Sequence, residues 1–184
     1  MPHEEYYERN LPHWYPEGRT IFITCRLYGS LPQSLSQRLL SNKKTPGQQF
    51  VQFDRNLDQA NYGPRWLEES QIAELVVASL QKGSAELNHY SLRSFVVMAN
   101  HVHLLIDPQA PLSTIMKGLK GATARSANKL LGRTGKSFWQ DESFDHWVRD
   151  EAEEQKVRHY IETNPVKAGL VDRAEDWPWS SAKK

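Results

Sequence analysis

Residues 94–107, which read SFVVMANHVHLLID, constrain the fold of this chain more than any other segment. Two runs of strand-forming residues flank the dipeptide Ala99-Asn100, a pattern that predicts a tight antiparallel hairpin. Side chains alternate between the two faces of a strand, so His101 and His103 should project together, away from their apolar neighbours. Two imidazoles on one strand are potential metal ligands, and they are equally compatible with ordinary histidines that hydrogen-bond to neighbours.

Further strands and helices are predicted on both sides of this hairpin. Alternating apolar residues indicate strands at residues 20–28, 89–98, 101–107 and 143–149. Helical spacing indicates helices at residues 33–40, 63–83, 112–131 and 151–163, with Gly83 ending the second and Asn164-Pro165 ending the last. The long strands and helices alternate as in a ferredoxin-like βαββαβ core, which is an α+β fold with an antiparallel sheet and here an additional C-terminal helix.

The rest of the chain is predicted to connect or cover this core. Residues 1–18 contain prolines and glycine and are expected to form an irregular lead-in. Residues 42–63 are polar and are interpreted as a long connection, and residues 172–184 as a tail packed on the body. With 184 residues and no internal repeat, the chain is expected to be a single domain over residues 1–184.

The composition excludes several classes of protein. No apolar run approaches the length of a membrane helix, and the acidic N-terminus does not resemble a signal peptide. The single cysteine, Cys25, rules out an intramolecular disulfide and a cysteine zinc site, and its apolar surroundings suggest a buried thiol. These features predict a cytoplasmic protein with no membrane partner.

Positive charge is concentrated in one part of a nearly neutral chain. The formal net charge is +1, yet residues 112–140 contain basic residues and no aspartate or glutamate. A local basic stripe is typical of a phosphate-binding surface, and it is also what a solvated helix face looks like. The candidate phosphate contacts are Lys117, Lys120, Arg125 and Lys129, together with Arg19 from the lead-in.

The last predicted helix carries a second pair of polar residues. Tyr160 and Asn164 are four residues apart and therefore share one helix face. If that face reaches His101 and His103, Asn164 offers a third metal ligand and Tyr160 a phenol that can attack a metal-polarised phosphodiester. A structural tyrosine and a helix-terminating asparagine are the alternatives.

Two motifs together resemble a known family. VVMANHVHLLI and HYIETNPVKAGLV, in this order, are similar to those of the HUH single-tyrosine transposase superfamily, and more narrowly of the REP-associated tyrosine transposases of bacteria. The segments LPHWYPEGRTIFITCRLYGSLP, GPRWL, FWQDESFDHWVRD and WPWSS also resemble that family, so the similarity spans nearly the whole chain. One departure is Ala99, where the family usually has proline, and it touches no proposed catalytic atom.

The resemblance implies a ferredoxin-like fold and a metal-dependent DNA strand transferase. Mg²⁺ or Mn²⁺ would be held by His101, His103 and Asn164, and Tyr160 would cut single-stranded DNA and keep a 5′-phosphotyrosine link. The partner would be hairpin-forming DNA of the repetitive extragenic palindrome type, and the protein is expected to be a monomer rather than a homodimer. His146 would orient a ligand or contact phosphate, or make a structural hydrogen bond.

Two other functions remain open at this point. The first is a host-adopted DNA-binding or regulatory protein with little or no transposition. The second is an HUH replication initiator, although such proteins usually have longer chains.

Overall fold

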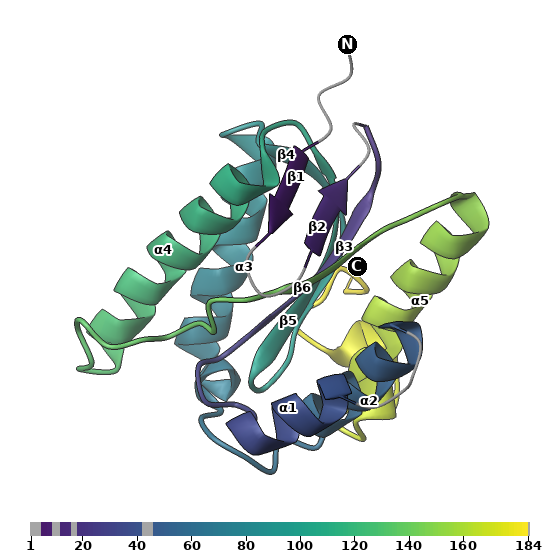
Figure 1. The fold of residues 1–184 in the computed structure, drawn as a ribbon. Helices are drawn as coiled ribbons and strands as arrows, with labels where there is room; N and C mark the ends of the chain where they lie inside the picture. The colour runs from purple at the N-terminus through teal and green to yellow at the C-terminus, as the bar shows by residue number, and fades with distance from the viewer. Residues whose placement is uncertain (1–4, 9–11, 16–17, 42–45, 184) are drawn as a thin grey trace.

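A central antiparallel sheet of four strands organises the computed structural model, which describes residues 5–8, 12–15, 18–41 and 46–183 (Figure 1). Its strands are β3 (Ile21–Arg26), β4 (Tyr90–Val97), β5 (His101–Pro108) and β6 (Phe144–Trp147), in the spatial order β4-β5-β3-β6. Helix α3 (Ser70–Ala85) connects β3 to β4, and α4 (Leu112–Leu130) connects β5 to β6. This arrangement confirms the ferredoxin-like core and the hairpin predicted from the sequence.

The two faces of the sheet are covered by different elements. Val102 and Leu104 of β5 belong to the larger apolar core, which α3 and α4 complete. Leu105 of β5 points the other way, into a smaller apolar cluster with Phe22 and Ile161. The strand alternation predicted around His101 and His103 is therefore present, with the histidines on the smaller-cluster face.

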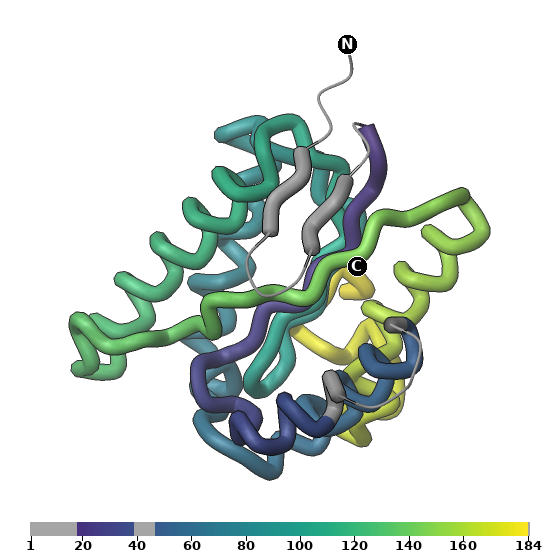
Figure 2. Tube along the Cα trace, viewed as in Figure 1, coloured from purple at the N-terminus to yellow at the C-terminus, as the bar shows by residue number. Residues whose placement is uncertain are grey.

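Three helices lie on or beside that second face. They are α1 (Gln33–Ser41), α2 (Pro46–Asp58) and α5 (Glu151–Lys167), and Figure 1 shows α2 and α5 next to one another. Figure 2 traces the chain from the end of α4 across the sheet through β6 to the start of α5. The α5 helix begins at Asp150, whose carboxylate accepts a hydrogen bond from the Glu153 backbone amide and caps the helix.

The α5 helix does not end at residue 163, as the sequence suggested. It continues through Asn164 and Pro165 to Lys167, and the chain then turns at Gly169, whose φ is +70°. Proline costs one intrahelical hydrogen bond and disfavours helical geometry before it. Here Ile161, Asn164 and Pro165 are all buried, so packing against the sheet outweighs that cost in the final turns.

Two segments interpreted as irregular contain regular structure. Residues 42–63 include α2, because Phe50, Phe53 and Leu57 recur at helical spacing on its inner side. The lead-in includes the antiparallel strands β1 (Glu5–Glu8) and β2 (Pro12–Tyr15). The remaining residues of the 1–18 lead-in, apart from Gly18, lie outside the described residues.

The start and end of the second predicted helix also differ. Residues 63–69 form a turn and the short helix η1 (Trp66–Glu68), and α3 then begins at Ser70. Gly83 lies inside α3 rather than at its end. The Tyr90 ring occupies the space that a side chain at this position would need, which accounts for the glycine.

The chain beyond α5 forms the short helix η2 (Ala174–Asp176) and then runs along β4. The Val97 amide donates to the Trp179 carbonyl at 2.9 Å, and the Ser181 amide donates to the Phe95 carbonyl at 3.0 Å. The outer edge of β4 is therefore partly paired by these residues. Among the described residues, no helix combines the length and apolarity that crossing a membrane requires.

Candidate metal centre and nucleophile

The two histidines of β5 are fully buried and held by hydrogen bonds at one ring nitrogen each. His101 Nδ1 lies 2.8 Å from Asn100 Oδ1, and His103 Nδ1 lies 2.8 Å from Thr24 Oγ1. The amide oxygen of Asn100 only accepts, so Nδ1 of His101 carries the proton and Nε2 presents a lone pair. The Thr24 hydroxyl, which can donate or accept, holds Nδ1 of His103 and so directs Nε2 of that ring toward the same cluster. This is the orientation that metal-binding histidines adopt.

Two carboxylates from α2 face these nitrogens. Asp54 Oδ1 lies 3.2 Å from His103 Nε2 and 3.9 Å from His101 Nε2. Asp58 Oδ1 lies 3.5 Å from His101 Nε2, and the two aspartates are one helical turn apart. Ligand atoms of Asp54, His101 and His103 all lie within 4.8 Å of one another, and all three residues are buried.

Burial and mutual charge set the protonation of this cluster. Burial, followed by repulsion from His103, lowers the pKa of His101 to about 3, so this ring is neutral near neutral pH. Burial also tends to raise the pKa of Asp54, but the adjacent His103 and His101 outweigh it and the pKa is lowered. Burial and the charge of Asp54 raise the pKa of Asp58 to about 7. A neutral imidazole beside an ionised carboxylate is the protonation pattern that metal binding requires.

The cluster contains buried polar atoms that have no hydrogen-bond partner. They include Nε2 of both histidines, both carboxylate oxygens of Asp54, Oδ1 of Asp58 and both amide atoms of Asn164. Unpaired buried polar atoms are costly, and a bound cation would satisfy the ring nitrogens and the oxygens together. The carboxylate and amide oxygens suit hard divalent cations such as Mg²⁺ and Mn²⁺, and the two imidazoles suit transition-metal ions. The residues present therefore fit a divalent metal.

Helix α5 brings Tyr160 to the same place. The centroid of its ring lies 5.7 Å from that of His103 and 6.2 Å from that of Phe50 on α2. Asn164, one turn further along, is buried beside Asp58, and its contact opposes the larger effect of burial that raises the pKa of Asp58. The structure thus brings together His101, His103, Tyr160 and Asn164, as their spacing suggested.

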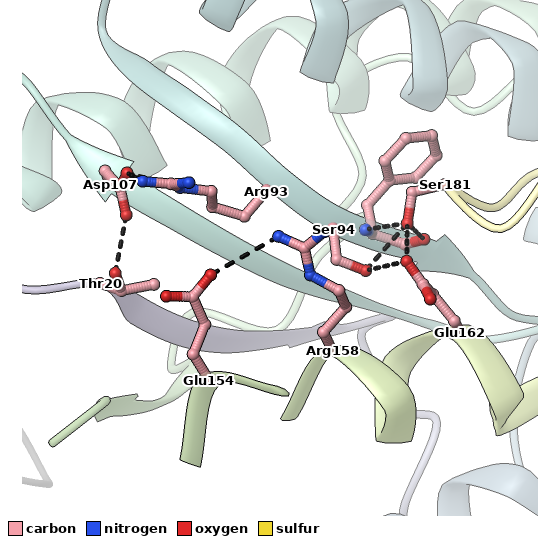
Figure 3. Close-up of polar contacts among 9 residues, drawn as sticks. Thr20, Arg93, Ser94, Asp107, Glu154, Arg158, Glu162 and Ser181 are labelled. Atoms are coloured by element: carbon pink, nitrogen blue, oxygen red, sulfur yellow. Dashed lines mark hydrogen bonds and ion pairs between the residues drawn. The ribbon is translucent and has the colours of Figure 1, made fainter. Parts of the chain in front are cut away.

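Polar contacts of Glu162 hold α5 against the sheet close to Tyr160 (Figure 3). Glu162 accepts hydrogen bonds from Ser94 of β4 and Ser181 of the tail, both at 3.4 Å. Toward the start of the helix, Arg158 pairs with Glu154 at 3.5 Å. The Arg158–Glu154 pair lies within α5, whereas the contacts of Glu162 join α5 to β4 and the tail two residues after Tyr160.

The predicted basic residues do not lie beside the histidine cluster. Helix α4 packs on the larger core, across the sheet from the histidines, so the stripe of Lys117, Lys120, Arg125 and Lys129 is separated from the cluster. Lys120 donates to the backbone carbonyls of Gln140 and Asp141, both at 2.9 Å, and thereby holds the segment after α4. The other three residues are exposed.

Arg19 and His146 also make local contacts. The Arg19 guanidinium lies 5.8 Å from the centroid of the Trp147 ring and donates to the Arg149 carbonyl at 3.3 Å. His146 Nε2 lies 3.1 Å from Glu153 Oε1, which is the structural hydrogen bond that the sequence left open for this residue.

Asp54 and Asp58 are the residues of this cluster that sequence reasoning missed. Their segment was interpreted as a connection, although the helical spacing of Phe50, Phe53 and Leu57 marks α2. That spacing places Asp54 and Asp58 on or beside the inward side of the helix, where a carboxylate needs a partner.

The comparisons with known proteins agree with this geometry. The family model described as "Transposase IS200 like" matches residues 65–164, a segment that includes both histidines, Tyr160 and Asn164 but not Asp54. A Haemophilus influenzae protein assigned by name to the REP-associated tyrosine transposases is 29% identical over 114 residues. That alignment covers 56% of this chain and 65% of the relative, which is less than two thirds of its length.

A solved structure shares the fold. It is the structure of a REP-associated tyrosine transposase bound to a REP hairpin, with a TM-score of 0.59 and 19% sequence identity. The superposition covers 95% of this chain and 82% of that one. The matched family segment spans more than half of the chain and contains the histidine pair and the tyrosine, so the chain belongs to the IS200-like transposase family.

Proposed function

We propose that this protein is a metal-dependent endonuclease and strand transferase for single-stranded DNA, of the REP-associated tyrosine transposase type. The observation that carries the proposal is the position of the Tyr160 ring, 5.7 Å from His103 beside a buried cluster of unpaired metal-ligand atoms. Metal-assisted attack on a phosphodiester requires a nucleophile and, beside it, a metal ion that polarises the phosphate.

The metal would be held by His101, His103 and Asp54, with Asn164 as a further oxygen ligand. Bound there, Mg²⁺ or Mn²⁺ would polarise the phosphodiester and stabilise the charge that develops during attack. The burial of the donor atoms supports this assignment, because a site with few competing waters strengthens charge–charge interactions.

The covalent step belongs to Tyr160. Its phenol loses a proton and the oxygen attacks phosphorus, the bond from phosphorus to the 3′ oxygen breaks, and that oxygen takes up a proton and leaves as a hydroxyl. The 5′ phosphate remains on the tyrosine. Attack by a 3′-hydroxyl on this link reverses the chemistry and rejoins a strand, so one residue serves both cleavage and transfer.

Hairpin-forming DNA is the proposed partner. The relative's name and the hairpin in the related solved structure support it. Lys117, Lys120, Arg125, Lys129 and Arg19 remain proposed phosphate contacts, and those on α4 would bind DNA away from the cleavage site. Lys120 would do so only if it releases its two carbonyl partners.

The test is a covalent adduct assay. The protein is incubated with a labelled hairpin oligonucleotide carrying a single-stranded flank and Mn²⁺, then separated on a denaturing gel. The wild-type protein should form an adduct, and Tyr160→Phe should form none while binding the same DNA with little change, because only the nucleophilic oxygen is lost.

The matched control is Tyr28→Phe, which removes the same oxygen from an exposed tyrosine. It should leave the adduct unchanged. An undiminished adduct in Tyr160→Phe would refute the assignment of the nucleophile. Wild-type protein that binds the hairpin without forming an adduct would instead indicate a DNA-binding protein without cleavage.

A further inference from the structure

Lys167 lies over the proposed nucleophile. Its Nζ is 4.5 Å from the centroid of the Tyr160 ring. The two residues are seven positions apart, close to two helical turns, and they share one face because α5 continues past Pro165. A helix ending at residue 163, as the sequence suggested, would not have placed this lysine beside the tyrosine.

The charge of Lys167 also reaches the carboxylates of the cluster. Burial is the largest single influence on the pKa of Asp54 and of Asp58 and acts to raise each, although the histidines leave that of Asp54 lowered overall; the positive charge of Lys167 acts to lower both. The ammonium group therefore lies over the tyrosine ring and near enough to the acidic side of the cluster for its charge to act there.

Lys167 has no carboxylate partner within ion-pair distance among the residues that the structure describes, and it is exposed. A purely structural explanation is that a lysine in the last turn interacts favourably with the helix dipole. Lys82 also lies in the last turn of its helix, α3, where it pairs with Glu86 at 3.8 Å, and α3 packs on the face of the sheet opposite the cluster. This second lysine allows the two explanations to be separated.

We propose that Lys167 is a phosphate-binding residue of the catalytic site, an inference that rests on the proposed function above. Its ammonium group binds a non-bridging oxygen of the phosphodiester that Tyr160 attacks, and stays on that phosphate in the covalent intermediate. Lysine binds phosphate as a compact charge with three donors, and a cation placed at a transferring phosphoryl group stabilises charge in the transition state.

The first measurement is the rate of adduct formation at saturating hairpin DNA with Mn²⁺. Lys167→Gln should slow it about a hundredfold, the usual loss when one preorganised donor is removed from developing charge. Lys167→Arg should restore most of the rate, because it keeps the charge. Lys82→Gln should leave the rate unchanged.

The second measurement does not depend on cleavage. In a Tyr160→Phe background, the salt dependence of hairpin binding is measured with and without Lys167→Gln. Loss of one phosphate contact to a single strand should reduce the slope of log K against log salt by about 0.7. Thermal unfolding of each variant is recorded, so that a loss of folding is recognised.

The possible outcomes distinguish the catalytic role of Lys167 from a structural role and from failure of the proposed function. An unchanged rate in Lys167→Gln overturns the inference, including the case in which only the salt slope changes, since the lysine would then bind a different phosphate. An equal loss in Lys82→Gln also overturns it, in favour of helix stability. Absence of any wild-type adduct refutes the proposed function, and with it the catalytic role of Lys167, while the salt slope still tells whether the residue binds DNA.

Discussion

At the scale of single residues, Asp54 changes the composition of the metal site. The family motifs offer two imidazoles and an amide oxygen, whereas Asp54 adds a buried carboxylate 3.2 Å from His103 Nε2. A carboxylate supplies a full negative charge, and ligand charge is a main determinant of affinity for divalent cations in oxygen-rich sites. Asp54 lies on α2, outside the matched family segment.

Asp54→Asn should therefore weaken Mn²⁺ binding by at least about tenfold, because it removes charge and keeps shape. Isothermal titration of the protein with Mn²⁺ measures this directly, with Asp141→Asn as a control on an exposed aspartate. If Asp54→Asn binds Mn²⁺ normally while Asn164→Ala does not, the ligand set is His101, His103 and Asn164, without the aspartate.

A second residue-scale prediction concerns acid stability. Hydrogen bonds from Arg149, which outweigh partial burial, and a further contact from His146 lower the pKa of Glu153 to about 2. A carboxyl with a lowered pKa in the folded state stabilises the protein above its ordinary pKa, and that contribution is lost as pH falls from about 4.5 toward 2.

Glu153→Gln should consequently be less stable than the wild type at pH 6, and the difference should shrink as pH falls through this window. Urea unfolding at pH 6, 4 and 3 measures the effect, with Glu74→Gln on the exposed side of α3 as the control for loss of one surface charge. A difference that stays constant across the three pH values would contradict the assignment.

At the scale of elements, the helical segments that the sequence pattern did not predict are stabilised by close packing. Both α2 and the last turn of α5 have unfavourable local signals, namely a polar composition and an internal proline. Each is held by burial of one face against the sheet. Packing also accounts for Gly83 in the interior of α3, because the Tyr90 ring occupies the space that a side chain would need.

Gly83→Ala gives a direct measure of that packing. A Cβ at this position would lie 2.4 Å from Tyr90 Oη, so the substitution should lower the free energy of unfolding by about 1–3 kcal/mol. Gly118→Ala, in the interior of α4 with open space around it, should raise that free energy by about 0.5–1 kcal/mol. Urea unfolding of both variants tests this, and equal effects would mean that Tyr90 adjusts freely.

At the scale of the whole molecule, the sequence predicted the parts of the site that depend on local spacing. Alternation on β5 placed His101 and His103 together, and helical periodicity placed Tyr160 and Asn164 on one face of α5. Asp54 could not be found in this way, because its position depends on how α2 packs against a strand about fifty residues later. The distance of α4 from the histidines likewise follows from the path of the chain rather than from any motif.

The proposed site is assembled from three segments far apart in the chain: α2, β5 and α5. Contacts between such distant segments form late in folding, since the intervening chain must first be ordered. During synthesis the histidines leave the ribosome well before Tyr160 does. An incomplete chain would therefore contain the proposed metal ligands without the proposed nucleophile, and the proposed DNA cleavage would require residues through Lys167 to be made and docked on the sheet.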